Sequence, residues 1–238
     1  MDETGTCWLD VADVLAAGVD RLVLYGPPGT GKSYAALHLG VGDVPAERLT
    51  CTEDLTSAEV IGSWMPRDGG TWSWRLGPAL RAWTAHGGRG GRLVIDEIDR
   101  ASGDALSVLM GVTDSTASAR WRHPETGTWL TPGPQFSVVV TTNLEDLEDL
   151  PSALLDRFAV RIRVDQPPLA AVASLSSDLR QPALAGSLAE RERRVSLRSF
   201  YAFDQLRPSL GAERAARLVF GASSAVDVLD ALRVGALR

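Results

Sequence analysis

The sequence predicts an α/β fold: a five-stranded parallel sheet with helices on both faces, two hairpin insertions and a small all-helical domain at the C-terminal end. Three observations support this prediction. Short, β-rich apolar runs alternate with helix-like stretches over the first two thirds of the chain, which is typical of parallel sheets. Two segments between these runs place a turn between strand-like flanks. After Val164 no strand-like run follows.

The expected elements follow from local composition. Strands are expected where apolar and β-branched residues cluster, at 21–25, 47–51, 92–96, 136–142 and 159–164. Helices are expected at 32–39, 78–85 and 103–112, the second with Pro78 at its first position. Hairpins are expected at 61–77, around a DGG turn, and at 119–133, around PETG.

The C-terminal third is expected to be helical. The segment DQPP at 165–168 breaks the chain. The Ala-, Leu- and Arg-rich sequence beyond it predicts helices at 168–180, 184–207 and 211–234. We therefore expect an α/β domain over residues 1–165 and a helical domain over residues 166–238.

Composition narrows the class of protein. The net charge is −6 and the pI about 5.1, and no run of basic residues indicates a nucleic-acid tail. This acidic balance argues against direct nucleic-acid contact, although it does not rule out a local basic patch. Cys7 and Cys51 are expected to be reduced core thiols. The acidic N-terminus does not resemble a signal peptide, and no segment approaches the about 18 apolar residues of a membrane span, so a cytoplasmic protein is expected.

The segment GPPGTGKS at 26–33 predicts a phosphate-binding loop. It fits the pattern G-x-x-x-x-G-K-S and lies between an expected strand and an expected helix. Its glycines allow backbone N–H groups to approach phosphate oxygens, and Lys32, the only lysine in the chain, offers a compact ammonium to the β- and γ-phosphates. Ser33 can ligate Mg²⁺ through its hydroxyl. The alternative is an ordinary Gly/Pro turn before a helix. The residues expected to contact a nucleotide here are Gly26, Pro27, Pro28, Gly29, Thr30, Gly31, Lys32, Ser33 and Tyr34.

A pair of acids supports this interpretation. The apolar run RLVID ends in Asp96, and Glu97 follows it. A carboxylate at a strand end can hold Mg²⁺ and its water shell, and a neighbouring glutamate can act as general base on an attacking water. By itself such a pair is commonly a solvated strand end. About 60 residues after a phosphate loop, it predicts a P-loop NTPase with Asp96 and Ser33 at the metal and Glu97 and Lys32 as catalytic groups.

At this point the chain resembles the AAA+ ATPases, and more closely their MoxR-like and dynein-related branch. The resemblance is carried by GPPGTGKS (26–33), VIDEIDRA (94–101), VVTTN (139–143) and LPSALLDRF (150–158). It covers residues 20–165 strongly and the helical tail weakly. It implies an ATP-binding domain over 1–165 and a helical lid over 166–238, with the nucleotide between them.

The resemblance assigns roles to three further residues. Asn143 resembles the sensor-1 residue, which holds water or the γ-phosphate; the alternative is a strand-end turn. Arg157 resembles the arginine finger, which acts in a neighbouring subunit; the alternative is a surface ion pair with Asp156. Arg198 resembles the sensor-2 arginine that contacts the nucleotide, although Leu197 stands where the branch usually has proline.

Other features complete the comparison with the branch. Arg100 is a candidate subunit-interface residue. The two expected hairpins fall where the branch carries insertions, and Trp72 and Trp74 alternate onto one face, where they either contact a substrate or pack on their own domain. The chain differs from the branch in its short lid and in Asp99, where asparagine is frequent.

Three functions are compatible with these motifs. The first is a Mg²⁺-dependent ATPase, active as a ring and by resemblance a hexamer, that remodels or matures a protein client such as a von Willebrand factor A domain protein. The second is the motor subunit of a DNA-processing or restriction system of the McrB type, which can use GTP. The third is a nucleotide-gated scaffold with little turnover, against which the intact catalytic residues argue.

Overall fold

The computed structural model describes residues 6–41, 45–189 and 194–235. Its contacts divide the chain into two compact units, one of residues 10–26 and 32–163 and the other of residues 1–9, 27–31 and 164–238. The predicted division at residue 165 stays a prediction, and each unit is described by itself. Among the described residues, no helix is both long enough and apolar enough to cross a membrane.

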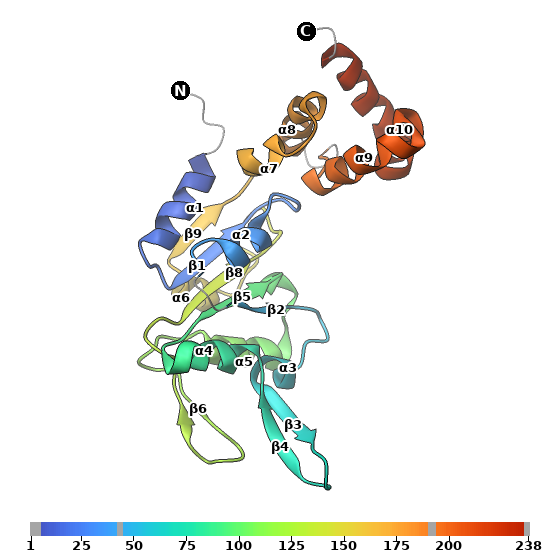
Figure 1. The fold of residues 1–238 in the computed structure, drawn as a ribbon. Helices are drawn as coiled ribbons and strands as arrows, with labels where there is room; N and C mark the ends of the chain where they lie inside the picture. The colour runs from blue at the N-terminus through green and yellow to red at the C-terminus, as the bar shows by residue number, and fades with distance from the viewer. Residues whose placement is uncertain (1–5, 42–44, 190–193, 236–238) are drawn as a thin grey trace. The chain divides into compact units, whose positions relative to one another are not determined.

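The larger unit is built on a five-stranded sheet in which every pairing is parallel (Figure 1). Its strands are β1 (Arg21–Tyr25), β2 (Glu47–Thr50), β5 (Arg92–Asp96), β8 (Ser137–Thr141) and β9 (Val160–Arg163), in the order β2-β5-β8-β1-β9. This confirms the predicted parallel sheet, and each strand begins within one residue of its expected position.

Helices cover both faces of this sheet. Those of the α/β region are α1 (Thr6–Ala16), α2 (Lys32–His38), α3 (Ser57–Ile61), α4 (Pro78–Gly88), α5 (Gly103–Val112) and α6 (Ser152–Arg157), with a 3₁₀ turn η1 (Ile98–Arg100) after β5. Helix α2 contacts β5 and β8, whereas α4 contacts β2 and β5 from the face that carries the main core. The sequence did not predict α1, α3 and α6. Since α3 and α6 have only five and six residues, they are too short to show a helical period.

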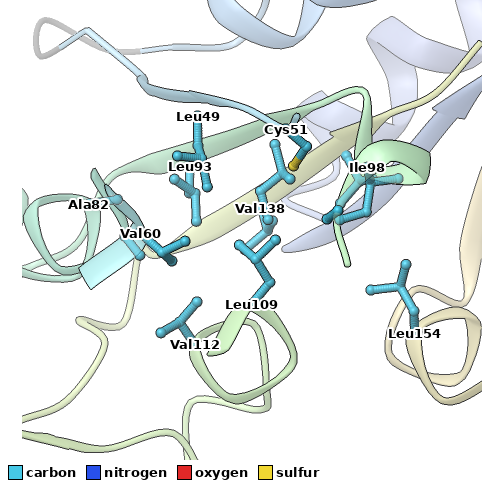
Figure 2. Packing of buried hydrophobic residues seen from close by; sticks show 14 of the residues in the cluster. Leu49, Cys51, Val60, Ala82, Leu93, Ile98, Leu109, Val112, Val138 and Leu154 are labelled. Atoms are coloured by element: carbon cyan, nitrogen blue, oxygen red, sulfur yellow. The ribbon is translucent and has the colours of Figure 1, made fainter. Parts of the chain in front are cut away.

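The main core lies between the sheet and the helices α3 to α6. Alternate strand residues such as Val23, Leu93 and Val138 point to this face, as period-two side-chain alternation requires. Figure 2 shows Val138 close to Leu109 of α5, and Leu154 of α6 belongs to the same cluster. This packing fixes the strands, and therefore the loops that follow their carboxyl ends.

The two cysteines occupy different environments. Cys51 belongs to the main core, and burial raises the pKa of its thiol to about 12, with a further rise from the nearby Asp96, Asp99 and Glu97. Cys7 is a free thiol like Cys51, but it is only half-buried. The expectation of a core thiol is therefore wrong for Cys7.

Both hairpins form as expected. The first pairs β3 (Gly62–Pro66) with β4 (Trp72–Leu76), and the second pairs β6 (Trp121–Arg122) with β7 (Trp129–Leu130). Trp72 is exposed, whereas Trp74 packs edge-on against Trp64 with 5.7 Å between ring centroids. The backbone N–H of Trp74 donates to the Glu125 carboxylate across 2.7 Å, so the two hairpins contact each other.

The described residues of the smaller unit beyond residue 168 are mainly helical. This unit contains α7 (Leu169–Ala173), a 3₁₀ turn η2 (Ser177–Leu179), α8 (Arg180–Leu188), α9 (Leu197–Leu210) and α10 (Ala212–Gly235). Its own core gathers around Leu179, Phe200, Phe203 and Ala215. Arg207 extends over the Phe203 ring and pairs with Asp178 and Asp204, which ties α9 to η2.

Two of the three expected C-terminal helices are wrong in extent. The stretch 168–180 is interrupted after Ala173, where the Ser174 hydroxyl donates back to the Ala171 carbonyl and competes with the helical pattern. The stretch 184–207 is interrupted because α8 ends at Leu188 and Ser196 caps a new helix by accepting from the Ser199 N–H. Residues 190–193 of that stretch lie outside the described residues. The third helix, 211–234, matches α10, with a break at Gly221.

Candidate functional site

Three sequence motifs converge at one edge of the sheet. Strands β5, β8 and β1 are neighbours and parallel, so their carboxyl ends lie side by side. The loop 26–31 follows β1, Asp96 ends β5, and Asn143 lies two residues beyond β8. In open parallel sheets, ligands bind at this edge.

The loop after β1 depends on its glycines. Gly26, Gly29 and Gly31 adopt positive φ values of 121°, 80° and 100°, in a region that strains residues with a side chain. The Gly26 N–H donates to the Leu144 carbonyl over 2.9 Å, which ties the start of the loop to the segment after β8. The Thr30 hydroxyl donates to the Pro27 carbonyl and closes the turn.

Lys32 is almost completely buried, with 5% of its surface exposed. Its ammonium donates to the Gly26 carbonyl over 2.8 Å and to Asn143 Oδ1 over 3.2 Å. Burial lowers the pKa of Lys32 to about 8, against the opposing effect of Asp96, Asp99 and Glu97. The Lys32 ammonium is thus held at this edge of the sheet, where its burial is unfavourable and a nearby negative charge would stabilise it.

Asp96 is buried and its carboxylate is fully occupied by donors. Oδ1 accepts from the Ser33 hydroxyl over 2.7 Å and from the Thr141 hydroxyl, and Oδ2 accepts from the Arg48 guanidinium over 2.5 Å. Burial would raise the pKa of Asp96, but these three donors outweigh it and the pKa is lowered. Asp96 is therefore an anion in the folded protein.

The oxygen atoms of Asp96 and Ser33 suit a magnesium ion. Asp96 and Ser33 present hard oxygen atoms at hydrogen-bonding distance from each other, which is the ligand type that Mg²⁺ prefers. Within the described part of the chain, no group of three or more His, Cys, Asp or Glu side chains could form a metal site by itself. Mg²⁺ is usually held by one or two protein oxygens together with substrate phosphates and water.

Glu97 lies beside Asp96 in a strained backbone conformation. Its φ and ψ are 57° and 49°, the left-handed region that residues other than glycine rarely adopt. Its Oε1 accepts from Asn143 Nδ2 over 3.3 Å, and its Oε2 lies 3.0 Å from Arg100 Nε. The strained backbone directs the carboxylate toward Asn143 and the site edge.

Asn143 connects the two motifs through both ends of its amide. The oxygen faces the Lys32 ammonium and the nitrogen faces the Glu97 carboxylate. This orientation matches the charge on each side. A polar chain therefore runs from the phosphate loop through Asn143 to Glu97.

The sequence did not predict the contacts of three supporting residues. Thr141 and Arg48 bind Asp96, and the buried Thr142 hydroxyl donates to Asp99 Oδ1 over 2.6 Å. Thr141 ends β8 and Thr142 follows it; neighbouring residues of an extended segment point to opposite sides, which could have indicated two separate contacts. Nothing in the sequence indicates Arg48, since its contact depends on which strand lies beside β5.

Other predicted site residues lie elsewhere. Arg157 Nη2 is 3.6 Å from Asp114 Oδ2, so its ion pair is with Asp114, not with Asp156 as the alternative supposed. The Asp114 carbonyl also accepts from Arg21, which begins β1. Arg157 therefore lies toward the amino end of the strands, away from Lys32 and Asp96.

Tyr34 and Arg198 are exposed. Tyr34 lies on α2 with its ring 4.5 Å from that of His38. Arg198 is in the first turn of α9, in the helical unit. Their contacts with a nucleotide stay predictions, as do the roles of Pro27, Pro28 and Thr30.

A family model matches residues 21–158, more than half of the chain, and its description is AAA domain (dynein-related subfamily). The matched range contains all four motifs on which the sequence resemblance rests. No curated protein matches the chain.

NtrX from Brucella abortus, whose structure is solved, shares this fold at low sequence identity. NtrX from Brucella abortus superposes with a TM-score of 0.54 at 15% identity, covering 86% of this chain and 51% of that one. NtrX in complex with ADP gives 0.53 at 15% identity, covering 85% and 49%. A provisionally named ATPase from Cytophaga hutchinsonii gives 0.48 at 16% identity, covering 87% and 59%. The chain thus spans about half the length of NtrX.

The buried Lys32 ammonium predicts a pH-dependent stability. The pKa of Lys32 is about 8 in the folded protein, against an ordinary value of 10.5 that applies to the unfolded chain. Between these two pH values the unfolded state binds more protons than the folded state, so the free energy of unfolding rises with pH. Relative to Lys32→Met, the nucleotide-free wild type should gain about 1 kcal/mol of unfolding free energy per pH unit between pH 8 and 10. Urea denaturation at several pH values measures this. A difference that does not vary with pH contradicts the assignment.

Proposed function

Because the chain belongs to the dynein-related subfamily of AAA domains, we propose that it binds ATP with Mg²⁺ at residues 26–33, hydrolyses it, and uses the cycle to remodel a partner protein. The observation that carries the proposal is the polar chain in which Asn143 connects Lys32 with Glu97. It joins the group that would bind a phosphate to the group that would activate water.

Binding would rest on the loop and Lys32. The glycine-rich backbone leaves N–H groups free to approach phosphate oxygens without a Cβ in the way. Lys32 would exchange its contacts with Gly26 and Asn143 for phosphate oxygens, and the added negative charge would offset the cost of its burial. Ser33 and Asp96 would hold Mg²⁺, which when bound neutralises phosphate charge and orients the triphosphate.

Hydrolysis would rest on Glu97 and Asn143. Glu97 would accept a proton from the water that attacks the γ-phosphorus. Its carboxylate is about one third exposed, so water can reach it. Asn143, already within hydrogen-bonding distance of Glu97 and Lys32, would position that water relative to the phosphate.

Arg157 would act on the nucleotide of a neighbouring subunit. In its own chain it lies toward the opposite end of the sheet from Lys32, and its buried Nε has no hydrogen-bond partner among the described residues. An arginine that completes a second subunit's site would make a ring the active form, and resemblance to the MoxR-like branch suggests a hexamer. The client, for which a von Willebrand factor A domain protein is the candidate, follows from the same resemblance.

Replacing Glu97 tests the hydrolytic step. Glu97→Gln keeps the shape of the side chain but removes the base, so ATP affinity should change less than about 3-fold while turnover falls by about 10²- to 10⁴-fold. Isothermal titration and a phosphate-release assay give the two quantities. Glu59→Gln, in a capping box on α3, is the matched control and should leave both unchanged. Normal turnover by Glu97→Gln would show that another group is the base.

Mixing two variants tests the trans role of Arg157. Arg157→Ala should lower turnover by about 10³- to 10⁵-fold, as for other arginine fingers. Arg157→Ala mixed with Glu97→Gln should recover part of the activity, because some interfaces combine an intact Glu97 with a neighbour's intact Arg157. Phosphate release from the mixture, compared with each variant alone, is the measurement. A mixture no more active than the sum of its parts argues that Arg157 acts within its own chain.

A further inference from the structure

Arg48 lies on β2, the strand that borders β5 at one edge of the sheet. The register pairs Arg48 with Val94 and Thr50 with Asp96. Since Arg48 and Thr50 point to the same face of β2, the Arg48 side chain runs along that face toward the end of β5. Its guanidinium reaches Asp96 Oδ2 at 2.5 Å.

The two partners of this ion pair differ in exposure. The Asp96 side chain is 6% exposed, whereas the Arg48 side chain is 50% exposed. A buried carboxylate without a cation is costly, but a half-exposed guanidinium can return to water at little cost. Arg48 can therefore leave the pair, and Asp96 requires another cation when it does.

The contacts of Asp96 show which cation could replace Arg48. Its Oδ1 faces Ser33, the other oxygen expected to hold Mg²⁺, and its Oδ2 faces the guanidinium. One carboxylate thus carries the charge sought by both the metal and the arginine. The Arg48 guanidinium and a metal ion bound to the same carboxylate would repel each other.

We propose that Arg48 is a cation that the chain itself supplies to Asp96 before Mg²⁺ arrives, and that Mg²⁺ must displace it. This inference rests on the proposed function, because it takes the nucleotide and its metal to bind at this site. Arg48 then has two opposite effects. Without metal it neutralises Asp96 and reduces its repulsion of phosphates; with metal it competes for the carboxylate.

The test measures binding of a non-hydrolysable ATP analogue to the full chain, once with EDTA and once in a Mg²⁺ titration. Arg48→Gln should weaken metal-free binding about 3- to 10-fold, because the Asp96 charge is no longer compensated. It should also lower, by about the same factor, the Mg²⁺ concentration that gives half-maximal binding. Isothermal titration or analogue fluorescence reports both quantities without turnover.

Two variants make the result specific. Arg81→Gln is the matched control: Arg81 pairs with Glu47, also on β2, through contacts of 2.9 and 2.6 Å, and it should change neither quantity. Arg48→Met keeps the apolar stem and removes the charge, so it should reproduce the effect of Arg48→Gln. If the Arg48→Gln protein does not fold, Arg48→Met serves as the test variant in its place.

Three outcomes overturn the proposal. Arg48 variants that match wild type in both conditions show that the pair has no influence on the metal. Variants that weaken binding equally with and without Mg²⁺ show that Arg48 contacts the phosphates or supports the fold. Wild-type protein that binds the analogue in neither condition overturns the proposed function together with this inference, whereas the first two outcomes leave the proposed function intact.

Discussion

The parallel order of β5, β8 and β1 is the constraint on which the candidate site depends. It places the ends of three strands side by side, although Lys32, Asp96 and Asn143 are separated by 47 to 111 positions in the chain. The buried core between this sheet and its helices holds the strands in that order. The polar contacts from Lys32 to Glu97 are therefore a consequence of apolar packing beneath them.

The site concentrates charge and strain that the fold must compensate. A buried ammonium (Lys32), a buried carboxylate (Asp96) and a glutamate in a left-handed conformation (Glu97) lie at the same edge of the sheet. Each is individually unfavourable. Hydroxyls from Ser33 and Thr141, the amide of Asn143 and the guanidinium of Arg48 offset these costs in the absence of ligand. Perturbed groups of this kind cluster at functional sites.

The sequence predicted the strands and the contiguous motifs well, for a physical reason. Buried parallel strands need apolar runs, and a phosphate loop needs glycines and a lysine at fixed spacing, so both are visible locally. The contact between Arg48 and Asp96 was not predictable, because the strand order is not local information. The single helix expected over 184–207 was wrong because most of its residues favour a helix, whereas the start of α9 depends on Ser196 acting as a cap. The partner of Arg157 was also missed, since Asp114 follows α5 and is far from Arg157 in the sequence.

The central claim is that the loop at 26–33 and the carboxylate of Asp96 together bind a triphosphate and its metal. A crystal structure with a non-hydrolysable ATP analogue and Mn²⁺ tests this most directly, because anomalous scattering locates the metal. We expect phosphate density at Lys32 Nζ and a Mn²⁺ peak at Ser33 Oγ and Asp96. Nucleotide bound elsewhere, with this edge of the sheet vacant, would contradict it.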